Sequence, residues 1–199
     1  MKRIALFSLL ISLFTLISFQ SQAQEEKDTL AYERPYSQIL QAGFSFGYFG
    51  YGYVGNRTGF TLPLSASYET YFGDHISGGG FIGYASYKYE GFDGNEYGWT
   101  FLDFGVRASY HYVHILNEIT DASFDPAKVD FYITLMLIFE NRSFSSDSDF
   151  YSGYYDNEFD VILGPVAGVR YKFSESFAAF FEGGRGTFGY GTLGVSMMF

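Results

Sequence analysis

The chain has 199 residues, of which 22% are aromatic and only 17% charged, and it contains no cysteine. Without cysteine, disulfides and thiol chemistry are excluded. Acidic residues outnumber basic ones 22 to 12, so the net charge is −10 and nucleic-acid phosphates would be repelled. The length fits one domain behind an export leader.

The first residues have the pattern of a secretory signal peptide. Lys2 and Arg3 precede a mostly apolar stretch, 4–19, and Ser21-Gln22-Ala23 is a small-x-small cleavage site. A retained anchor helix is the less favoured alternative, because the stretch is short and lacks a stop-transfer flank. We therefore predict a signal peptide over 1–23, a polar periplasmic tail over 24–37 and a β-barrel over 38–199. Cleavage leaves 10 basic against 22 acidic residues, a net charge of −12.

Period-two alternation predicts eight strands in the mature chain. The clearest places Leu102, Phe104 and Val106 on one face and Asp103 and Arg107 on the other. The predicted strands are 40–48, 62–72, 76–89, 99–113, 129–141, 158–173, 177–185 and 192–199. The fourth, fifth and sixth exceed the roughly 9–11 residues that a tilted strand needs to cross a bilayer.

The predicted connections alternate in length. Tight turns at 73–75 and 174–176 contrast with longer loops at 49–59, 89–98 and 143–157, as in outer-membrane barrels with long loops outside and both termini in the periplasm. The segment 116–128 is a long connection on the short-turn side, and we expect a helical turn in it. Pro165 lies inside the sixth predicted strand, where its missing N–H predicts a local bulge.

Alternation alone does not say which face points inward. A lipocalin-like barrel would have an apolar cup and a soluble exterior. The polar face here is built from Gly, Ser and Thr and is poor in Lys, and the apolar face carries Tyr and Phe near strand ends. These features favour an all-β, eight-stranded antiparallel up-and-down transmembrane β-barrel whose apolar face meets lipid.

An eight-stranded barrel has an interior that side chains can fill. Charges placed there must be paired or hydrated. We predict that Arg107 and Arg170 bridge to Glu182, Asp103 or Glu69, which would plug the barrel. Acids outnumber bases, so some carboxyls lie near the wet ends or hold a proton or cation. The predicted inward charged and histidine side chains are Glu69, Asp103, Arg107, His111, Asp130, Glu140, Glu158, Asp160, Arg170, Lys172 and Glu182.

No cofactor or metal site is predicted. The histidines lack zinc spacing, and the acidic stretches 90–96 and 147–149 resemble solvated loops more than calcium loops. A hydrolase built on Ser109, His111 and Asp103 is disfavoured, because the three share one strand and no oxyanion hole is evident. Exposed loop aromatics could contact a partner or extend the interfacial girdle. These candidates are Tyr51, Tyr53, Phe92, Tyr97, Phe150, Tyr151, Tyr154 and Tyr155.

Several stretches resemble the small outer-membrane β-barrel proteins of Bacteroidota and, more broadly, the OmpA-barrel, OmpX and OmpW groups. They are 104–112 (FGVRASYHY), 128–132 (KVDFY), 168–173 (GVRYKF) and 181–184 (FEGG), followed by the strand that ends in Phe199. The resemblance covers most of the mature chain. It implies that Phe199 is the signal read by the barrel assembly machinery. The stretch 135–138 (LMLI) has fewer small residues than this pattern.

The sequence therefore leads us to expect a non-enzymatic, monomeric barrel of the cell outer membrane, in contact with lipid and lipopolysaccharide. Its role would be structural, or would involve surface interactions through Tyr- and Asp-rich loops with an unknown extracellular partner. The first alternative is an OmpW-like channel for small solutes or apolar ligands. The second is a lipid A-modifying hydrolase that uses His111. Nucleic acid is not an expected partner.

Overall fold

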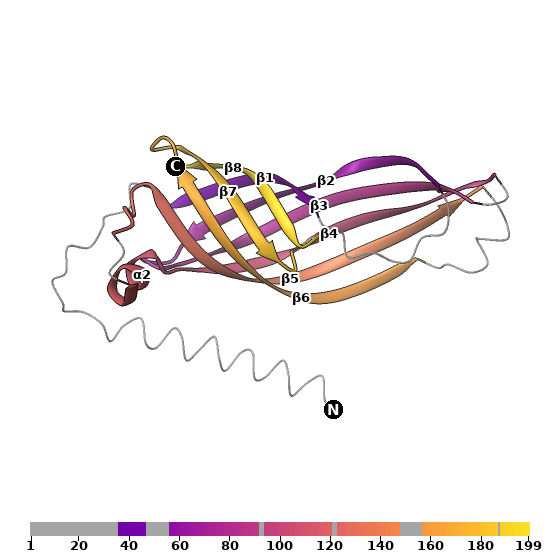
Figure 1. Ribbon diagram of the computed structural model, residues 1–199. Coiled ribbons are helices and arrows are strands. Elements are labelled where there is room, and N and C mark those ends of the chain that lie inside the picture. Colours follow the sequence, from indigo (N-terminus) through magenta and orange to yellow (C-terminus); the bar gives the residue numbers. More distant parts are fainter. Residues whose placement is uncertain (1–35, 47–55, 92–93, 121–122, 148–156, 187) are drawn as a thin grey trace, which may run out of the picture. The chain divides into compact units, whose positions relative to one another are not determined.

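The structure of the chain is a computed structural model that describes residues 36–46, 56–91, 94–120, 123–147, 157–186 and 188–199. The predicted signal peptide and nearly all of the predicted tail lie outside these ranges. Eight antiparallel strands close into a barrel in sequence order, as Figure 1 shows, which confirms the predicted fold class. The strands are β1 Gln38–Phe46, β2 Asn56–Tyr71, β3 Ile76–Glu90, β4 Glu96–His111, β5 Val129–Ser146, β6 Glu158–Lys172, β7 Phe177–Gly184 and β8 Gly191–Met198.

The strand faces divide as the alternation predicts, with apolar side chains outside and polar ones inside. In β4, Leu102 and Val106 are 40% and 56% exposed, whereas Asp103 and Arg107 are 0% and 6% exposed. Side chains of a strand alternate between the two faces of its sheet, so one sequence can satisfy both environments. Apolar side chains therefore cover the outer surface of the closed barrel, and polar side chains lie in its interior.

The strands differ greatly in length. β1, β7 and β8 have 9, 8 and 8 residues, whereas β2 to β6 have 15 to 18. The long strands run beyond the closed part of the barrel as a projecting sheet (Figure 1). The predicted loops 89–98 and 143–157 are consequently shorter than expected, because β4 begins at Glu96 and β5 continues to Ser146.

The polarity of the two faces reverses in this projecting sheet without a change of register between β3, β4 and β5. Its outer face carries Ser86, Lys88 and Thr100, while its inner face carries Tyr87 and Phe101, which are 4% and 2% exposed. The prediction assigned these strand ends to loops because apolar residues no longer occupy the outer face in the projecting sheet. The strands themselves continue.

The bulge predicted at Pro165 in the sixth strand is absent, so this prediction is wrong. It pairs directly with Leu135 of β5, and the β5–β6 register is unbroken from Val129 to Arg142. The Pro165 carbonyl accepts from the Arg185 N–H at 3.0 Å, so the missing Pro165 donor also faces the β7 side. β7 ends at Gly184, and the proline therefore lies where that ladder stops.

The irregularity occurs instead in β2, next to the other proline of the barrel wall. The β2–β3 register shifts between Thr61 and Leu64, around Pro63, and again between Arg57 and Gly59. Bulges and proline are common at strand edges, where they discourage pairing with another chain. This outer half of β2 lies beyond its pairing with β1, which extends only to Leu64.

The long connection on the short-turn side contains α2, Val113–Thr120, which directly follows β4. None of its residues is buried, and Ile119 is 71% exposed. The predicted helical turn is thus present but starts three residues before the predicted connection. Among the described residues, no helix has the length and apolar character needed to cross a bilayer.

Candidate functional site: the charged lumen

Arg107 is the centre of the charged interior. Its Nε lies 3.0 Å from Glu69 Oε1, and its Nη2 donates to Glu182 Oε1 at 2.7 Å. Both carboxylates are among the three partners expected for it. The contacts join β4 to β2 on one side and to β7 across the lumen, so a single guanidinium connects distant parts of the wall.

The hydrogen bonds around Arg107 extend to every strand of the barrel. Arg107 also donates to Ser67 at 3.3 Å and to Thr134 at 3.4 Å, and Ser67 donates to Gln41 of β1. Gln41 in turn donates to Ser196 of β8 at 3.3 Å. Buried polar groups are costly unless they are paired, and here they pair across the barrel. The lumen network, as we call it, comprises Gln41, Ser67, Glu69, Ser77, Arg107, Ser109, His111, Asp130, Tyr132, Thr134, Arg170, Glu182 and Ser196.

Arg170 does not make the bridges that the sequence suggested. It donates to Asp130 through Nη1 and to Ser196 through Nε, and its guanidinium lies 4.7 Å from the centre of the Tyr132 ring. Asp130 and Arg170 are directly opposite in the β5–β6 ladder, which explains the pairing. The expected partners Glu182, Asp103 and Glu69 are wrong for this arginine, because alternation gives the face of a residue but not its cross-strand neighbour.

His111 lies in an arrangement with the distances of a nucleophilic triad. Its Nε2 is 3.0 Å from Ser77 Oγ, and its Nδ1 is 2.9 Å from Asp130 Oδ1. However, Ser77 is fully buried, and its hydroxyl donates to Glu69 at 2.6 Å. A hydroxyl that is closed off from substrate and already bonded to a carboxylate has the surroundings of a structural group.

The constellation considered from the sequence, Ser109 with His111 and Asp103, does not form. Ser109 Oγ donates to Glu69 at 2.8 Å and lies 2.8 Å from Thr134 Oγ1. Asp103 lies further along β4 and has no hydrogen bond to either residue. The three side chains share a face of the strand, as expected, but each belongs to different neighbours.

Gly168 provides the space that the lumen network needs on β6. It lies opposite Tyr132, whose hydroxyl donates to Glu182 at 3.0 Å. A Cβ atom built on Gly168 would fall 2.7 Å from that hydroxyl oxygen and closer still to the ring. Any larger residue would displace Tyr132 from Glu182, so the glycine is required by packing.

A second charged group lies toward the projecting sheet. Arg142 donates to Glu140 at 2.7 Å, to Asp160 at 3.1 Å and to Glu158. Glu158 and Asp160 were predicted to face the lumen, but their side chains are 57% and 51% exposed. They lie on the part of β6 beyond the end of β7, where the wall is incomplete. Sequence reasoning missed Arg142, although it shares the alternation of Glu140.

Asp103 stands apart from both groups. It is fully buried, and neither carboxylate oxygen has a hydrogen-bond partner. It lies opposite Glu140 in the β4–β5 ladder and opposite Gly83 in the β3–β4 ladder. The expected bridge from an arginine to Asp103 is therefore absent.

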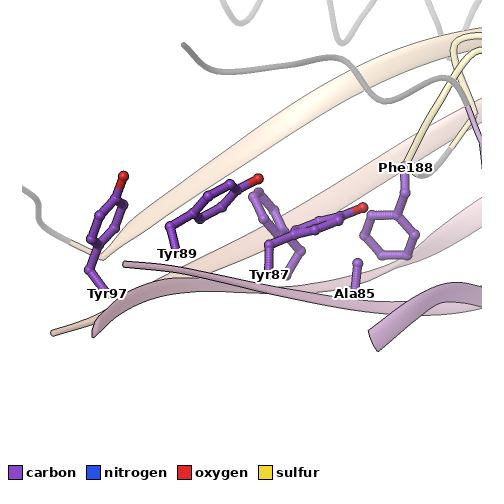
Figure 2. Close-up of a cluster of buried hydrophobic side chains, with 6 residues drawn as sticks. Ala85, Tyr87, Tyr89, Tyr97 and Phe188 are labelled. Carbon is purple, nitrogen blue, oxygen red and sulfur yellow. The ribbon is translucent and has the colours of Figure 1, made fainter. Parts of the chain in front are cut away.

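Apolar layers separate the charged groups along the lumen. Phe81, Met136, Ile138 and Val166 form one cluster. A second, the aromatic cluster, lies on the inner face of the projecting sheet, and Figure 2 shows Tyr87, Tyr89 and Tyr97 following one another along it. The aromatic cluster comprises Ala85, Tyr87, Tyr89, Tyr97, Phe101 and Phe188, with Trp99 and Phe144 packed against it.

Phe188, from the connection between β7 and β8, reaches into the barrel. Figure 2 shows its ring beside Ala85, and a Cβ built on Gly83 would fall 2.6 Å from this ring. A cavity of about 20 Å³ in the lumen borders Phe81, Arg107, Met136, Phe180 and Glu182. One water needs about 10–15 Å³ by this measure, so the cavity has room for about one.

The predicted loop contacts mostly lie outside the described residues, namely Tyr51, Tyr53, Phe92, Phe150, Tyr151, Tyr154 and Tyr155. Tyr97 is the exception, and its predicted place in an exposed loop is wrong. It belongs to β4, is 8% exposed and stacks on Tyr89 at 5.7 Å between ring centres. Phe199 exchanges backbone hydrogen bonds with Gln38, at 2.9 and 3.1 Å, and its side chain is 51% exposed. Its role as an assembly signal stays a prediction.

In the part of the chain that the structure describes, no three His, Cys, Asp or Glu side chains are placed to hold a metal ion. His75 and His114 stack with ring centres 3.9 Å apart.

The fold defines a class, the closed eight-stranded antiparallel barrel with an apolar exterior and a polar interior. No family model and no curated protein matches the chain. Among solved structures it is similar to the N-terminal β-barrel domain of Pseudomonas aeruginosa OprF, with 20% identity and a TM-score of 0.42 over 81% of this chain and 96% of that one. It is also similar to Yersinia pestis Ail, solved with the heparin analogue sucrose octasulfate, with 13% identity and a TM-score of 0.40 over 81% and 90%. Neisserial surface protein A gives 16% identity and a TM-score of 0.37 over 82% and 94%.

Proposed function

We propose that this protein is an integral outer-membrane barrel with a lumen filled by side chains, and that its role is structural or involves surface interactions. The apolar wall supports membrane insertion, because a closed sheet pairs its backbone groups internally and exposes hydrophobic side chains to lipid. The contacts of Arg107 with Glu69 and Glu182 carry the proposal of a closed lumen. A guanidinium held by two carboxylates on different strands occupies the centre of the passage.

Planar-bilayer recording tests the closed lumen. The purified, refolded protein should give no conductance steps, while an open porin in the same bilayer gives them. Tyr132→Ala should introduce conductance, because it removes a buried ring that spans toward Glu182. Phe104→Ala is the matched control, since Phe104 is 45% exposed on the outer wall. Reproducible steps from the unmodified protein would eliminate the proposal of a filled lumen.

The absence of enzymatic function is part of the proposal. It is supported by the burial of Ser77 and by the hydrogen bond from its hydroxyl to Glu69. An activity-based fluorophosphonate probe should not label the refolded protein. Lipid A from cells with and without the gene should be identical. Labelling that disappears in Ser77→Ala would show instead that the serine is a nucleophile.

A second candidate function is the binding or passage of an apolar molecule from the projecting end. It is favoured by the aromatic cluster on the inner face of the sheet and by the missing wall beyond Pro165 and Gly184. An apolar ligand that enters there should quench the fluorescence of Trp99, the only tryptophan of the chain. Quenching that saturates at one ligand per chain, and is lost in Phe101→Ala, would favour this candidate over the first.

The partners that we propose follow from the proposed position of the barrel in the outer membrane. Outer-membrane lipid and lipopolysaccharide would cover the wall, and the barrel assembly machinery would insert the chain. We propose a monomer without cofactors.

A further inference from the structure

Asp103 is a buried carboxyl group without a hydrogen-bond partner among the described residues. The side chain is fully buried, and both carboxylate oxygens lack a hydrogen bond. It lies between the Phe101 and Gly105 positions of β4, and Phe101 belongs to the aromatic cluster. An ionised carboxylate in such surroundings is strongly unfavourable unless a positive charge reaches it.

The nearest charged group on the neighbouring strand is also a carboxylate. Glu140 lies directly opposite Asp103 in the β4–β5 ladder, on the same inner face, and is 8% exposed. Directly opposed residues have Cβ atoms about 4.5–5.5 Å apart, so the two carboxylates can approach a common ion. Without a shared cation, two negative charges in these opposed positions repel each other.

The positive charge of Arg142 acts on Asp103, but no direct ion pair joins these two side chains among the described residues. Its guanidinium is already shared by Glu140, Asp160 and Glu158, which hold it toward the projecting end. Three carboxylates therefore share one arginine, and Asp103, opposite Glu140, adds a fourth acidic group to this region. Glu158 and Asp160 are half-exposed, so the negative potential extends to the solvent and draws cations toward the pair.

We propose that Asp103 and Glu140 bind one hard divalent cation, Mg²⁺ or Ca²⁺, at the projecting end of the lumen. Both ions prefer oxygen ligands, and Mg²⁺ is commonly held by one or two carboxylates while it retains several waters. The two carboxylates fit this coordination, and water or backbone oxygens complete the shell. The Asp103–Glu140 pair is thus a metal site of two protein ligands.

Titration calorimetry of the refolded full chain in a zwitterionic detergent, with Mg²⁺ and Ca²⁺ separately, tests the site. We expect one ion per chain for the unmodified protein. Asp103→Asn and Glu140→Gln should each weaken binding about tenfold or more, since each removes a ligand. Glu96→Gln is the matched control, because Glu96 is exposed at the start of β4 on the outer face. It should leave the affinity unchanged.

Thermal unfolding provides an independent measurement. Divalent ions should raise the melting temperature of the unmodified protein and of Glu96→Gln, but not that of Asp103→Asn. If Asp103→Asn does not fold, Glu140→Gln decides the result by the same comparison. No binding at millimolar ion, or equal binding by the unmodified protein and both lumen variants, would overturn the proposal. So would an infrared band of a protonated carboxyl that persists with saturating cation and disappears in Asp103→Asn, because a proton would then occupy the place of the metal.

Discussion

Arg107 shows how strongly the interior depends on one side chain. Its removal leaves Glu69 and Glu182 buried, without the cation that both contact. Breaking a buried ion pair by removing one partner costs more than the pair contributes, because the remaining charge cannot return to water. Arg107 therefore stabilises the barrel chiefly by neutralising the buried charges of Glu69 and Glu182.

We predict that Arg107→Met lowers the free energy of unfolding by about 3–5 kcal/mol. Urea titration of the protein refolded in lipid vesicles, followed by the heat-modified shift on gels, measures the change. Lys88→Met removes a cationic side chain that is exposed on the outer face of β3 and should change stability by less than about 0.5 kcal/mol. Equal effects of the two substitutions would contradict the central role of Arg107.

Most inward charged residues and the two partners of Arg107 could be predicted from the sequence, but the partner of Arg170 could not. Alternation along β4 correctly places Asp103, Arg107 and His111 inside. Which residue lies opposite each depends on register, which is fixed by turns and bulges and leaves no mark on a single strand. Arg170 was therefore assigned the wrong carboxylates, and the serine nearest to His111 Nε2 proved to be Ser77 on β3.

At the level of single strands, Pro165 shows that a proline can occupy a barrel wall at no cost to the register. Its neighbours pair normally with β5, and its missing donor faces the end of β7. Two residues further along, Ala167 pairs with Gly183 inside the β6–β7 ladder. In an antiparallel pair, alternate residues exchange hydrogen bonds with the same neighbour, so Ala167 also bonds toward β7.

This difference gives a matched pair of substitutions. We predict that Pro165→Ala changes stability by less than about 0.5 kcal/mol. Ala167→Pro should destabilise the barrel by about 3 kcal/mol, because it removes a ladder donor. Both positions are exposed on the outer face, so burial does not confound the comparison. Urea midpoints in vesicles measure both, and a neutral Ala167→Pro would contradict the assigned pairing.

The lengths of the strands were the least predictable feature of the elements. Eight strands and their order follow from the alternation, but β2, β4 and β5 extend past their predicted ends. In β5 the reason is the reversal of polarity, since Ser143 and Ser145 are exposed on the outer face while Phe144 packs against the aromatic cluster inside. A prediction that requires apolar residues on the outer face therefore ends the strand where the polarity reverses.

At the scale of the whole molecule, the apolar band of the wall defines where lipid would contact it. Val106 is 56% exposed within the band, whereas Thr100, on the same face of β4, lies where the outer surface has become polar. Strand residues rise about 3.4 Å each, so these two positions differ by about 20 Å along the strand. They therefore sample two environments on one face.

Tryptophan scanning in bilayers with brominated acyl chains tests this band. In a Trp99→Phe background, Val106→Trp should be strongly quenched, because bromine in the hydrocarbon contacts the band directly. Thr100→Trp should be quenched weakly, since it lies toward the headgroups. The unmodified protein, whose Trp99 packs against the aromatic cluster, should resemble Thr100→Trp. Equal quenching at positions 100 and 106 would mean that the band is wrongly placed.

The barrel closes where β1 pairs with β8, from Ile39 with Met198 to Phe46 with Gly191. The two partners of this seam are separated by almost the entire domain, so their meeting carries a large loop-closure cost and belongs late in folding. Until this seam forms, the sheet has two unpaired strand edges, β1 and β8. Unpaired strand edges readily pair with another chain, so the export to the outer membrane that we propose would require the unclosed barrel to be protected from aggregation.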